Sequence, residues 1–391
     1  MDRIKRIVYL IESPFNKRDY DRYGFEILQE NGFRVEVWDC TPYLRPQVHK
    51  KVVVPDPIDY DRHYQFFSIK ETAASLKRLF TDTIIICLVV YNLLSYRLFQ
   101  AITSARIPYC VFTGSRFPSL KARNGLLLLS EKMKSISLKK VINRAYMAIP
   151  LRYLRLRCAS FALVTGGKSD PKLNKMIGDS TEIILTHSFD YDIYLSLIKH
   201  DIEDNGNFAL FLDEYLPFHS DYVYHNLHPF SSAERYYPPL REYFDYFESK
   251  YKLEVIIAGH PRSNYDQHPD YFNGRKVVRG HTAELVKRSK IVFLHCSTAV
   301  NFAVLFKKPT VFITSDSLNG SGYEAFIYSL ASCFGKKPIN INRKNEYECE
   351  DFFHFDEGLY SRYKNQHIKV EGSEEKFSWQ IFADRIKGIQ H

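Results

Sequence analysis

The 391-residue sequence has little cysteine and no two cysteines at the spacing of a zinc or redox site. Its seven cysteines are scattered, their number is odd, and several lie in apolar runs such as IIICLVV at 84–90. The absence of CxxC pairs excludes common structural zinc sites, and the scatter argues against a disulfide framework. We therefore expect reduced, mostly buried thiols in a cytoplasmic protein that binds no metal.

Long apolar runs are also missing. The most apolar stretch, TIIICLVVYNLL at 83–94, has about a dozen residues, whereas a membrane-spanning helix needs about 20. The first residues, MDRIKRIVYLIESPF, include no cleavage site of small residues. These features predict buried strands in a cytoplasmic protein and argue against a secreted or membrane-spanning chain.

Several common fingerprints of catalysis and cofactor binding do not occur. The sequence has no HExxH, no GxSxG and no GxGxxG, and TGGKSD at 165–170 lacks the spacing of a P-loop. These absences argue against a metalloprotease, an α/β-hydrolase and a dinucleotide dehydrogenase.

Negative charge is scarce between Arg116 and Arg157, where eleven Lys or Arg accompany one acid, Glu131. The formal net charge is +9, and this basic segment interleaves its cations with Leu, Ile, Tyr and Met. A solvated helical face is the simplest interpretation. The alternative is a surface that docks on anionic lipid or on an anionic acceptor. No nucleic-acid-binding module is recognisable, so we expect no nucleic-acid partner.

The sequence does contain a repeated alternation of strand and helix patterns. RIVYLIESPF predicts a strand, DYDRYGFEILQENG at 19–32 a helix and FRVEVWDC a strand, which together make a βαβ unit. Further strands are expected in DTIIICLVVY, IPYCVFTGS, FALVTGG and EIILTHSFD. This pattern indicates an open parallel sheet with helices on its faces.

A second α/β unit follows the polar, turn-forming stretch IEDNGN at 202–207. Strands are expected in FALFLDEYLPF, LEVIIAG, KVVRG, IVFLHCS and KKPTVFITS, and helices at about 238–250 and in TAELVKRS and TAVNFAVLF. We therefore predict two Rossmann-like domains, 1–203 and 204–391. In such folds ligands bind at the carboxyl ends of the strands, so we expect a ligand in a cleft between the domains.

Three polar clusters each follow a predicted strand of the second domain: Asp213-Glu214, His260-Pro261-Arg262 and Ser297-Thr298. Imidazole and guanidinium groups donate to phosphate oxygens, and hydroxyls with free amides at a helix start favour an anion. A turn histidine and an ordinary helix N-cap are the simpler alternatives. HP also occurs at His228-Pro229 and His268-Pro269, but only His260 follows a clear buried strand.

The two neighbouring carboxylates raise a separate question. Adjacent strand residues face opposite sides, so only one of Asp213 and Glu214 should enter the ligand cleft. The alternative is a solvated loop carboxylate. His295, which precedes the Ser-Thr pair, alternates with the apolar face and is interpreted as merely buried.

The order of these clusters resembles that of bacterial glycosyltransferases with the GT-B fold that use CMP-activated sugars. Bacterial sialyltransferases share an acid pair, an HP pair and an S-S/T pair, which resemble Asp213-Glu214, His260-Pro261 and Ser297-Thr298. The closer resemblance is to the retaining Kdo transferases of capsule and O-antigen assembly, to which RYGFEILQENGFRVEVWDCTP and the chain length also look similar. The acid pair differs from the sialyltransferase pattern because Tyr215 follows it, not Gly, and because it begins the second domain.

The resemblance implies that the first domain binds the acceptor and the second the donor. It implies Asp213 as a covalent nucleophile on Kdo, an acidic eight-carbon keto sugar carried by CMP. His260, Arg262 and the Ser-Thr pair would bind the donor phosphate, with Pro261 and Glu214 in the same donor site. Glu131 is the predicted acceptor base. No metal or other cofactor is expected, and the acceptor would be a lipid-linked or free oligosaccharide. Segment 116–157 is the predicted peripheral contact with the inner membrane.

Three alternatives stay open at this point. An inverting, sialyltransferase-like enzyme would use another CMP-nonulosonate. A polyol-phosphate transferase of the teichoic-acid type would use a CDP-linked donor on a similar scaffold. A non-catalytic protein would hold anionic glycan or nucleic acid through the basic segment, with strongly salt-dependent affinity.

Overall fold

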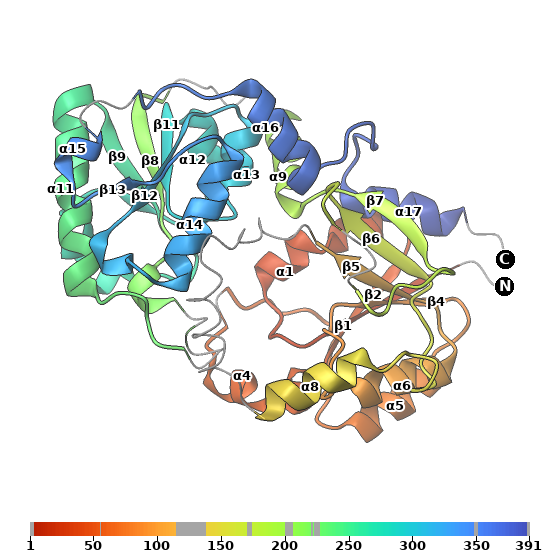
Figure 1. The fold of residues 1–391 in the computed structure, drawn as a ribbon. Helices are drawn as coiled ribbons and strands as arrows, with labels where there is room; N and C mark the ends of the chain where they lie inside the picture. Colours follow the sequence, from red (N-terminus) through yellow and green to blue (C-terminus); the bar gives the residue numbers. More distant parts are fainter. Residues whose placement is uncertain are drawn as a thin grey trace. The chain divides into compact units, whose positions relative to one another are not determined.

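The computed structural model of the chain describes residues 4–54, 56–114, 138–169, 174–199, 206–219, 222, 227–347 and 351–388. The described parts of Met1–Ser115, Ala122–His187 and Gly372–His391 form one compact unit, and those of Ser188–Glu371 form the other. In each unit helices cover a parallel sheet (Figure 1). The sequence predicted a division into 1–203 and 204–391. The units instead change at Ser188, and the chain returns to the first unit at Gly372.

The first unit is built on a seven-stranded sheet in the order β3-β2-β1-β4-β5-β6-β7, and all its strand pairs are parallel. Its strands are β1 Arg6–Ile11, β2 Arg34–Asp39, β3 His63–Gln65, β4 Thr83–Cys87, β5 Tyr109–Thr113, β6 Phe161–Thr165 and β7 Glu182–Thr186. The central strands β1 and β4 are apolar along most of their length because helices bury both faces.

The helices of the first unit include one segment from the far end of the chain. They are α1 Lys17–Arg22, α2 Phe25–Glu30, α3 Thr41–Leu44, α4 Pro46–Lys51, α5 Ile69–Lys77, α6 Tyr96–Ala105, α8 Leu138–Ala148 and α17 Ser378–Lys387. The last of these packs on α2 and β7. This packing places the final described residues in the first unit.

The single helix predicted over 19–32 is wrong in one respect, because the structure breaks it between α1 and α2. Gly24 has a φ of 62°, in the left-handed region that only glycine adopts without strain. A Cβ at Gly24 would lie 2.3 Å from the ring of Trp379 on α17, whose indole N–H donates to the carbonyl of Arg22 at 2.9 Å. The break therefore makes room for the returning helix.

The second unit has a six-stranded sheet in the order β10-β9-β8-β11-β12-β13, again with parallel pairs. Its strands are β8 Phe208–Leu212, β9 Glu254–Ala258, β10 Val277–Val278, β11 Ile291–Leu294, β12 Thr310–Thr314 and β13 Ile339–Asn340. Its α-helices are α9 Phe189–Lys199, α11 Ala233–Tyr251, α12 Thr282–Arg288, α13 Val300–Leu305, α14 Gly322–Cys333, α15 Lys344–Tyr347 and α16 Glu357–Tyr363. Short 3₁₀ turns lie at Leu216–Phe218, Tyr265–Gln267, Pro269–Phe272 and Asp316–Leu318, and a π turn at Lys364–Ile368.

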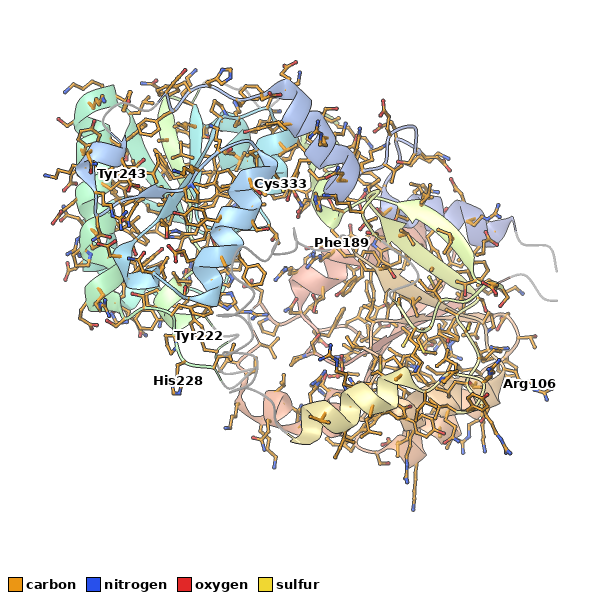
Figure 2. All side chains as sticks on the ribbon, viewed as in Figure 1. Arg106, Phe189, Tyr222, His228, Tyr243 and Cys333 are labelled. Carbon is orange, nitrogen blue, oxygen red and sulfur yellow. The ribbon has the colours of Figure 1, made fainter. Side chains whose placement is uncertain are left out.

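Helix α11 begins five residues earlier than the predicted start at about 238. Pro238 and Pro239 lie inside it, although proline removes a backbone donor and disfavours a helix interior. The helix buries a stripe at helical spacing: Tyr236, Tyr237, Leu240, Tyr243, Phe244 and Phe247. Tyr243, labelled in Figure 2, packs edge-on against Phe293 of β11, with the ring centroids 5.7 Å apart. Burial of this stripe outweighs the local cost of the prolines.

No helix in the described part of the chain is long and apolar enough to cross a bilayer. The six cysteines described there are free, and Cys40, Cys87 and Cys110 are buried.

Candidate active site

The three polar clusters of the second unit lie together at the carboxyl edge of its sheet. Strand β8 is flanked by β9 and β11, and its last residue, Leu212, is in register with Ala258 and Leu294, the last residues of those strands. The acid pair therefore follows the middle strand, the HP cluster follows one neighbour, and the Ser-Thr pair lies just beyond the other. The structure thus brings together the three clusters that the sequence singled out.

The buried carboxylate of Asp213 links the end of β8 to the loop that carries His260 and Pro261, here called the HP loop. Its side chain is 5% exposed. Oδ1 accepts from the backbone N–H of Tyr215 at 2.9 Å, and Oδ2 accepts from the N–H of His260 at 3.2 Å and the hydroxyl of Tyr265 at 2.8 Å. Burial raises the pKa of Asp213 to about 6, although these donors oppose the shift. The carboxyl group is therefore mostly ionised at neutral pH and fixed in orientation.

The Glu214 carboxylate links the end of β8 to the turn after β11 and to α14. Oε1 accepts from the backbone N–H of Cys296 at 2.7 Å, and Oε2 accepts from the hydroxyl of Tyr323 on α14. Asp213 thus contacts the loop after β9, and Glu214 contacts the turn after β11. Both residues follow β8, so the prediction from strand alternation that only one of them enters the ligand cleft stays a prediction. Each carboxylate is engaged by groups of the protein itself. Burial raises the pKa of Glu214 to about 7.

His260 is half-buried, and its ring is oriented by its own loop. Its Nδ1 accepts from the backbone N–H of Arg262 at 3.2 Å, so the neutral ring carries its proton on Nε2. A second imidazole, that of His219, lies beside it with the ring centroids 4.9 Å apart. His219 was not among the site residues predicted from the sequence. The only signal for it was a histidine close behind the acid pair, in DEYLPFH.

The Ser-Thr pair lies in the turn that leads from β11 into α13. Ser297 Oγ accepts from the N–H of Ala299 at 3.3 Å, while Thr298 is exposed. The helix begins only at Val300 and has six residues, so hydroxyls and turn amides are the groups available to an anion here. Glu214 already holds the Cys296 N–H. An anion bound to this turn would therefore favour the protonated form of Glu214.

His295 is a structural residue. It is fully buried, its Nδ1–H donates to the carbonyl of Ile313 at 2.7 Å, and its Nε2 accepts from the hydroxyl of Tyr236 at 2.8 Å. Burial lowers the pKa of His295 to about 4, so the ring is neutral. The interpretation of this histidine as merely buried is confirmed.

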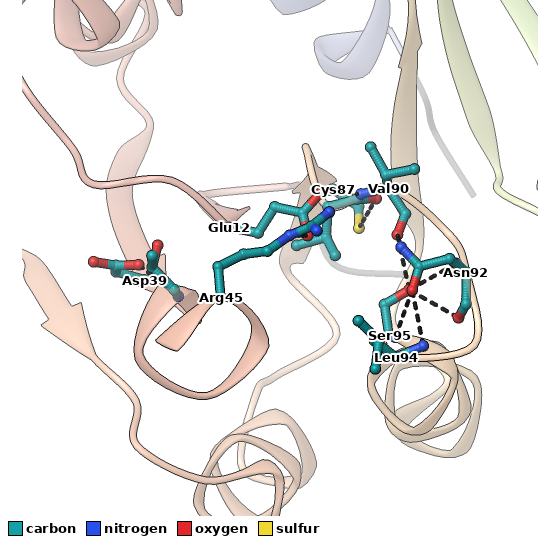
Figure 3. Close-up of polar contacts among 10 residues, drawn as sticks. Glu12, Asp39, Arg45, Cys87, Val90, Asn92, Leu94 and Ser95 are labelled. Carbon is teal, nitrogen blue, oxygen red and sulfur yellow. Dashed lines mark hydrogen bonds and ion pairs between the residues drawn. The ribbon is translucent and has the colours of Figure 1, made fainter. Parts of the chain in front are cut away.

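Glu131, the predicted acceptor base, lies outside the described residues. In the first unit the carboxyl end of the central strand β1 presents a different acid, Glu12, which the sequence analysis did not select. Its carboxylate accepts from the N–H of Val90 at 3.0 Å and pairs with Arg45 at 3.1 Å (Figure 3).

Among the described side chains, no group of three or more His, Cys, Asp or Glu is placed to hold a metal ion. That the reaction needs no metal ion stays a prediction from the sequence.

Glu214 should give the protein a measurable dependence of stability on pH. Its folded-state pKa, about 7, exceeds the ordinary value of 4.5, so between these values the native state binds more protons than the unfolded state. The free energy of unfolding then falls as the pH rises through this window. We expect Glu214→Gln to be more stable than wild type at about pH 8, by about 1 to 2 kcal/mol after allowance for solvent screening. The amide oxygen can still accept from the Cys296 N–H, and the Tyr323 hydroxyl can accept from the amide NH₂.

This gain should shrink as the pH falls toward 4.5 and vanish below it, where the glutamate is neutral in both the native and the unfolded state. Urea unfolding of both proteins across this range measures it. A stability difference that is constant with pH would show that the Glu214 carboxyl is not held in the way described.

No protein family profile matches the sequence, and no curated protein matches it. Several solved structures are similar to it. The wall teichoic acid polymerase TagF soaked with CDPG matches with a TM-score of 0.51 and 10% identity over 98% of this chain and 88% of that chain. MurG from Acinetobacter baumannii gives 0.44 and 11% over 98% and 100%. UDP-GlcNAc 2-epimerase from Methanocaldococcus jannaschii gives 0.41 and 10% over 91% and 98%.

These identities are low, so the comparison with TagF shows the fold alone. Together with the two parallel sheets, it establishes a GT-B-like architecture of two Rossmann-like units. The predicted fold class is confirmed.

Proposed function

We propose that this chain is a glycosyltransferase that moves Kdo from CMP-Kdo to a saccharide acceptor of bacterial O-antigen or capsule, with retention of configuration. One observation carries the proposal. The acid pair, the HP pair and the Ser-Thr pair follow three adjacent parallel strands of one sheet, at the edge where open α/β sheets bind their ligands. The resemblance of these pairs to the motifs of CMP-sugar transferases supplies the donor class.

The donor phosphate is the ligand that these side chains suit best. The guanidinium of Arg262 and the imidazole of His260 supply positive or donating groups on the β9 side of the site. On the β11 side, Ser297 and Thr298 supply hydroxyls. His260 carries its proton on Nε2 when neutral and would protonate the phosphate of departing CMP.

Asp213 is the proposed nucleophile. Its carboxylate oxygen bonds to the anomeric carbon of Kdo while the bond from that carbon to the CMP phosphate breaks, and CMP leaves as a phosphate monoester. The acceptor hydroxyl oxygen then attacks the same carbon, and the bond to Asp213 breaks. The hydroxyl proton passes to the acceptor base, for which Glu131 is the predicted residue. Asp213 has a pKa of about 6, so it is mostly anionic at pH 7 to 8, as the first step requires.

A polyol-phosphate transferase with a CDP-linked donor is the second candidate. The specific observation in its favour is that Asp213 is buried with both oxygens already accepting hydrogen bonds. The imidazoles of His219 and His260 lie next to each other, with ring centroids 4.9 Å apart. In this mechanism a histidine removes the proton of the attacking hydroxyl, and Asp213 only positions the HP loop.

A donor panel tests the proposal. Purified full-length protein is incubated with CMP-Kdo, a CMP-sialic acid and CDP-glycerol in turn, each with and without an oligosaccharide acceptor, and CMP release is followed. Release from CMP-Kdo, with transfer to the acceptor, supports the proposal. CMP release from CDP-glycerol alone would replace it by the second candidate, and release from CMP-sialic acid alone would point to the sialyltransferase-like alternative.

A further inference from the structure

Two stretches of the first unit contain no acidic residue. The described residues 83–114 and 138–169 include no Asp or Glu and nine Lys or Arg. Four of these cations are exposed side chains on α6, on α8 and in the turn after α8: Arg97, Arg144, Arg152 and Arg155. The two stretches are therefore strongly cationic. The nearby carboxylate of Glu12 is already paired with Arg45, so the exposed arginines leave a net positive charge that attracts anions.

The same region exposes apolar side chains that a solvated face would not need. The loop after β4 presents Val90, Leu93 and Leu94, of which Leu94 is 70% exposed. Helix α8 and the turn after it present Val141, Ile142, Ile149 and Tyr153, the last being 68% exposed. We call these seven side chains and the four arginines the basic-apolar surface.

Polar contacts hold the loop and the helix of this surface side by side. The N–H of Leu93 donates to Asn143 Oδ1 on α8 at 3.0 Å. The hydroxyls of Tyr91 and Tyr146 are 2.5 Å apart. The Tyr96 hydroxyl donates to the carbonyl of Leu154 in the turn after the helix at 3.4 Å. The exposed apolar groups therefore belong to one surface.

Hydrogen bonds within the loop fix its backbone (Figure 3). Asn92 Oδ1 accepts from the N–H groups of Leu94 and Ser95 at 2.8 and 3.2 Å. Ser95 Oγ donates to the carbonyl of Val90 at 2.8 Å. Glu12 accepts from the Val90 N–H. The loop keeps its apolar tips in solvent because these bonds fix its backbone, so no ordering cost would be added when a partner covers them.

We propose that the basic-apolar surface binds the surface of a bilayer that contains anionic phospholipid. Leu94, Leu93, Val90 and the apolar side chains of α8 would insert among the acyl-chain ends, while the arginines remain at the level of the headgroup phosphates. Such binding requires apolar and cationic side chains close together, and the basic-apolar surface presents both. The proposal stands independently of the donor and of the reaction.

A soluble polyanion is the less suitable partner. It would use the arginines but would leave Leu94, Tyr153 and their neighbours exposed, and exposed apolar patches ringed by cations are typical of membrane-docking faces. Binding to a polyanion would also be unaffected by removal of the apolar side chains. That difference makes the two partners separable by experiment.

The test is co-sedimentation of the full-length protein with vesicles of phosphatidylcholine alone or mixed with phosphatidylglycerol. We expect binding to the mixed vesicles to be at least about tenfold tighter and to weaken strongly as salt rises from about 0.1 M to 1 M. Arg144→Gln with Arg152→Gln should lower the partition coefficient on mixed vesicles about 25-fold, at about fivefold for each charge.

The apolar half of the surface is tested with Leu94→Ser and Tyr153→Ser together, for which we expect a loss of about tenfold. The matched control is Phe80→Ser. Phe80 is similarly exposed in the same unit, but it precedes β4 and so lies at the end of the strand opposite to the Val90 loop. The control should bind like wild type. Thermal unfolding confirms that all variants are folded.

Two results would overturn the proposal. One is equal binding by wild type and the Leu94-Tyr153 variant together with tight, salt-sensitive binding to a soluble polyanion such as heparin, which would identify a polyanion surface. The other is the absence of any preference for phosphatidylglycerol vesicles.

Discussion

Replacing His260 by alanine is expected to lower the rate of transfer by about 10³-fold while the protein stays folded. The imidazole is half-buried, and the His260 backbone N–H remains bonded to Asp213 in the variant. The substitution therefore removes the group that would donate to the departing phosphate but keeps the hydrogen bond between Asp213 and the HP loop. The rate of CMP release at saturating donor, measured for both proteins, gives the effect.

His268→Ala is the matched control because this histidine also precedes a proline and belongs to the same unit, yet its ring stacks on Tyr271 with the centroids 4.7 Å apart. We expect a rate within about threefold of wild type, as for a residue outside the chemistry. A similar loss in both variants would mean that His260 acts through the fold, and an unchanged rate in His260→Ala would remove it from the mechanism.

Replacing Asp213 by asparagine is expected to have two effects. The rate of transfer should fall by about 10³- to 10⁴-fold, because an amide cannot form the covalent bond to the sugar. The free energy of unfolding should also fall, by about 1 to 3 kcal/mol, because the amide NH₂ replaces an oxygen that accepts from His260 or Tyr215 and satisfies no donor. Steady-state kinetics and urea unfolding measure the two effects separately.

Tyr265→Phe separates positioning from chemistry at the same carboxylate. It removes one of the donors to Asp213 Oδ2 and leaves the nucleophile in place, so we expect a cost of about 1 kcal/mol in stability and a rate within about tenfold of wild type. If Tyr265→Phe lost as much activity as Asp213→Asn, the carboxylate would be acting by holding the HP loop, and the nucleophilic role would be wrong.

The strands and the positions of the three clusters could be predicted because both depend on local sequence. Buried parallel strands appear as short apolar runs with β-branched residues, such as EVIIA before His260 and IVFL before Ser297. In a parallel sheet the ends of adjacent strands necessarily meet at one edge. The clusters therefore came together once the strand order placed β8 between β9 and β11.

The features that could not be predicted depend on contacts between distant parts of the chain. The break at Gly24 exists because Trp379 packs there, and nothing local to either residue indicates the pairing. The early start of α11 depends on a stripe of aromatic side chains that outweighs two prolines. The side chains that donate hydrogen bonds to the acid pair are Tyr265 and Tyr323, and only the folded loops bring them to the carboxylates.

The donor and the retaining mechanism are tested most directly by intact-protein mass spectrometry of the wild-type protein after incubation with CMP-Kdo generated in situ and without acceptor. We expect a population heavier by one Kdo residue, with release of CMP, and no such population for Asp213→Asn. Release of CMP without the adduct would contradict the covalent step. The absence of both would contradict Kdo transfer itself.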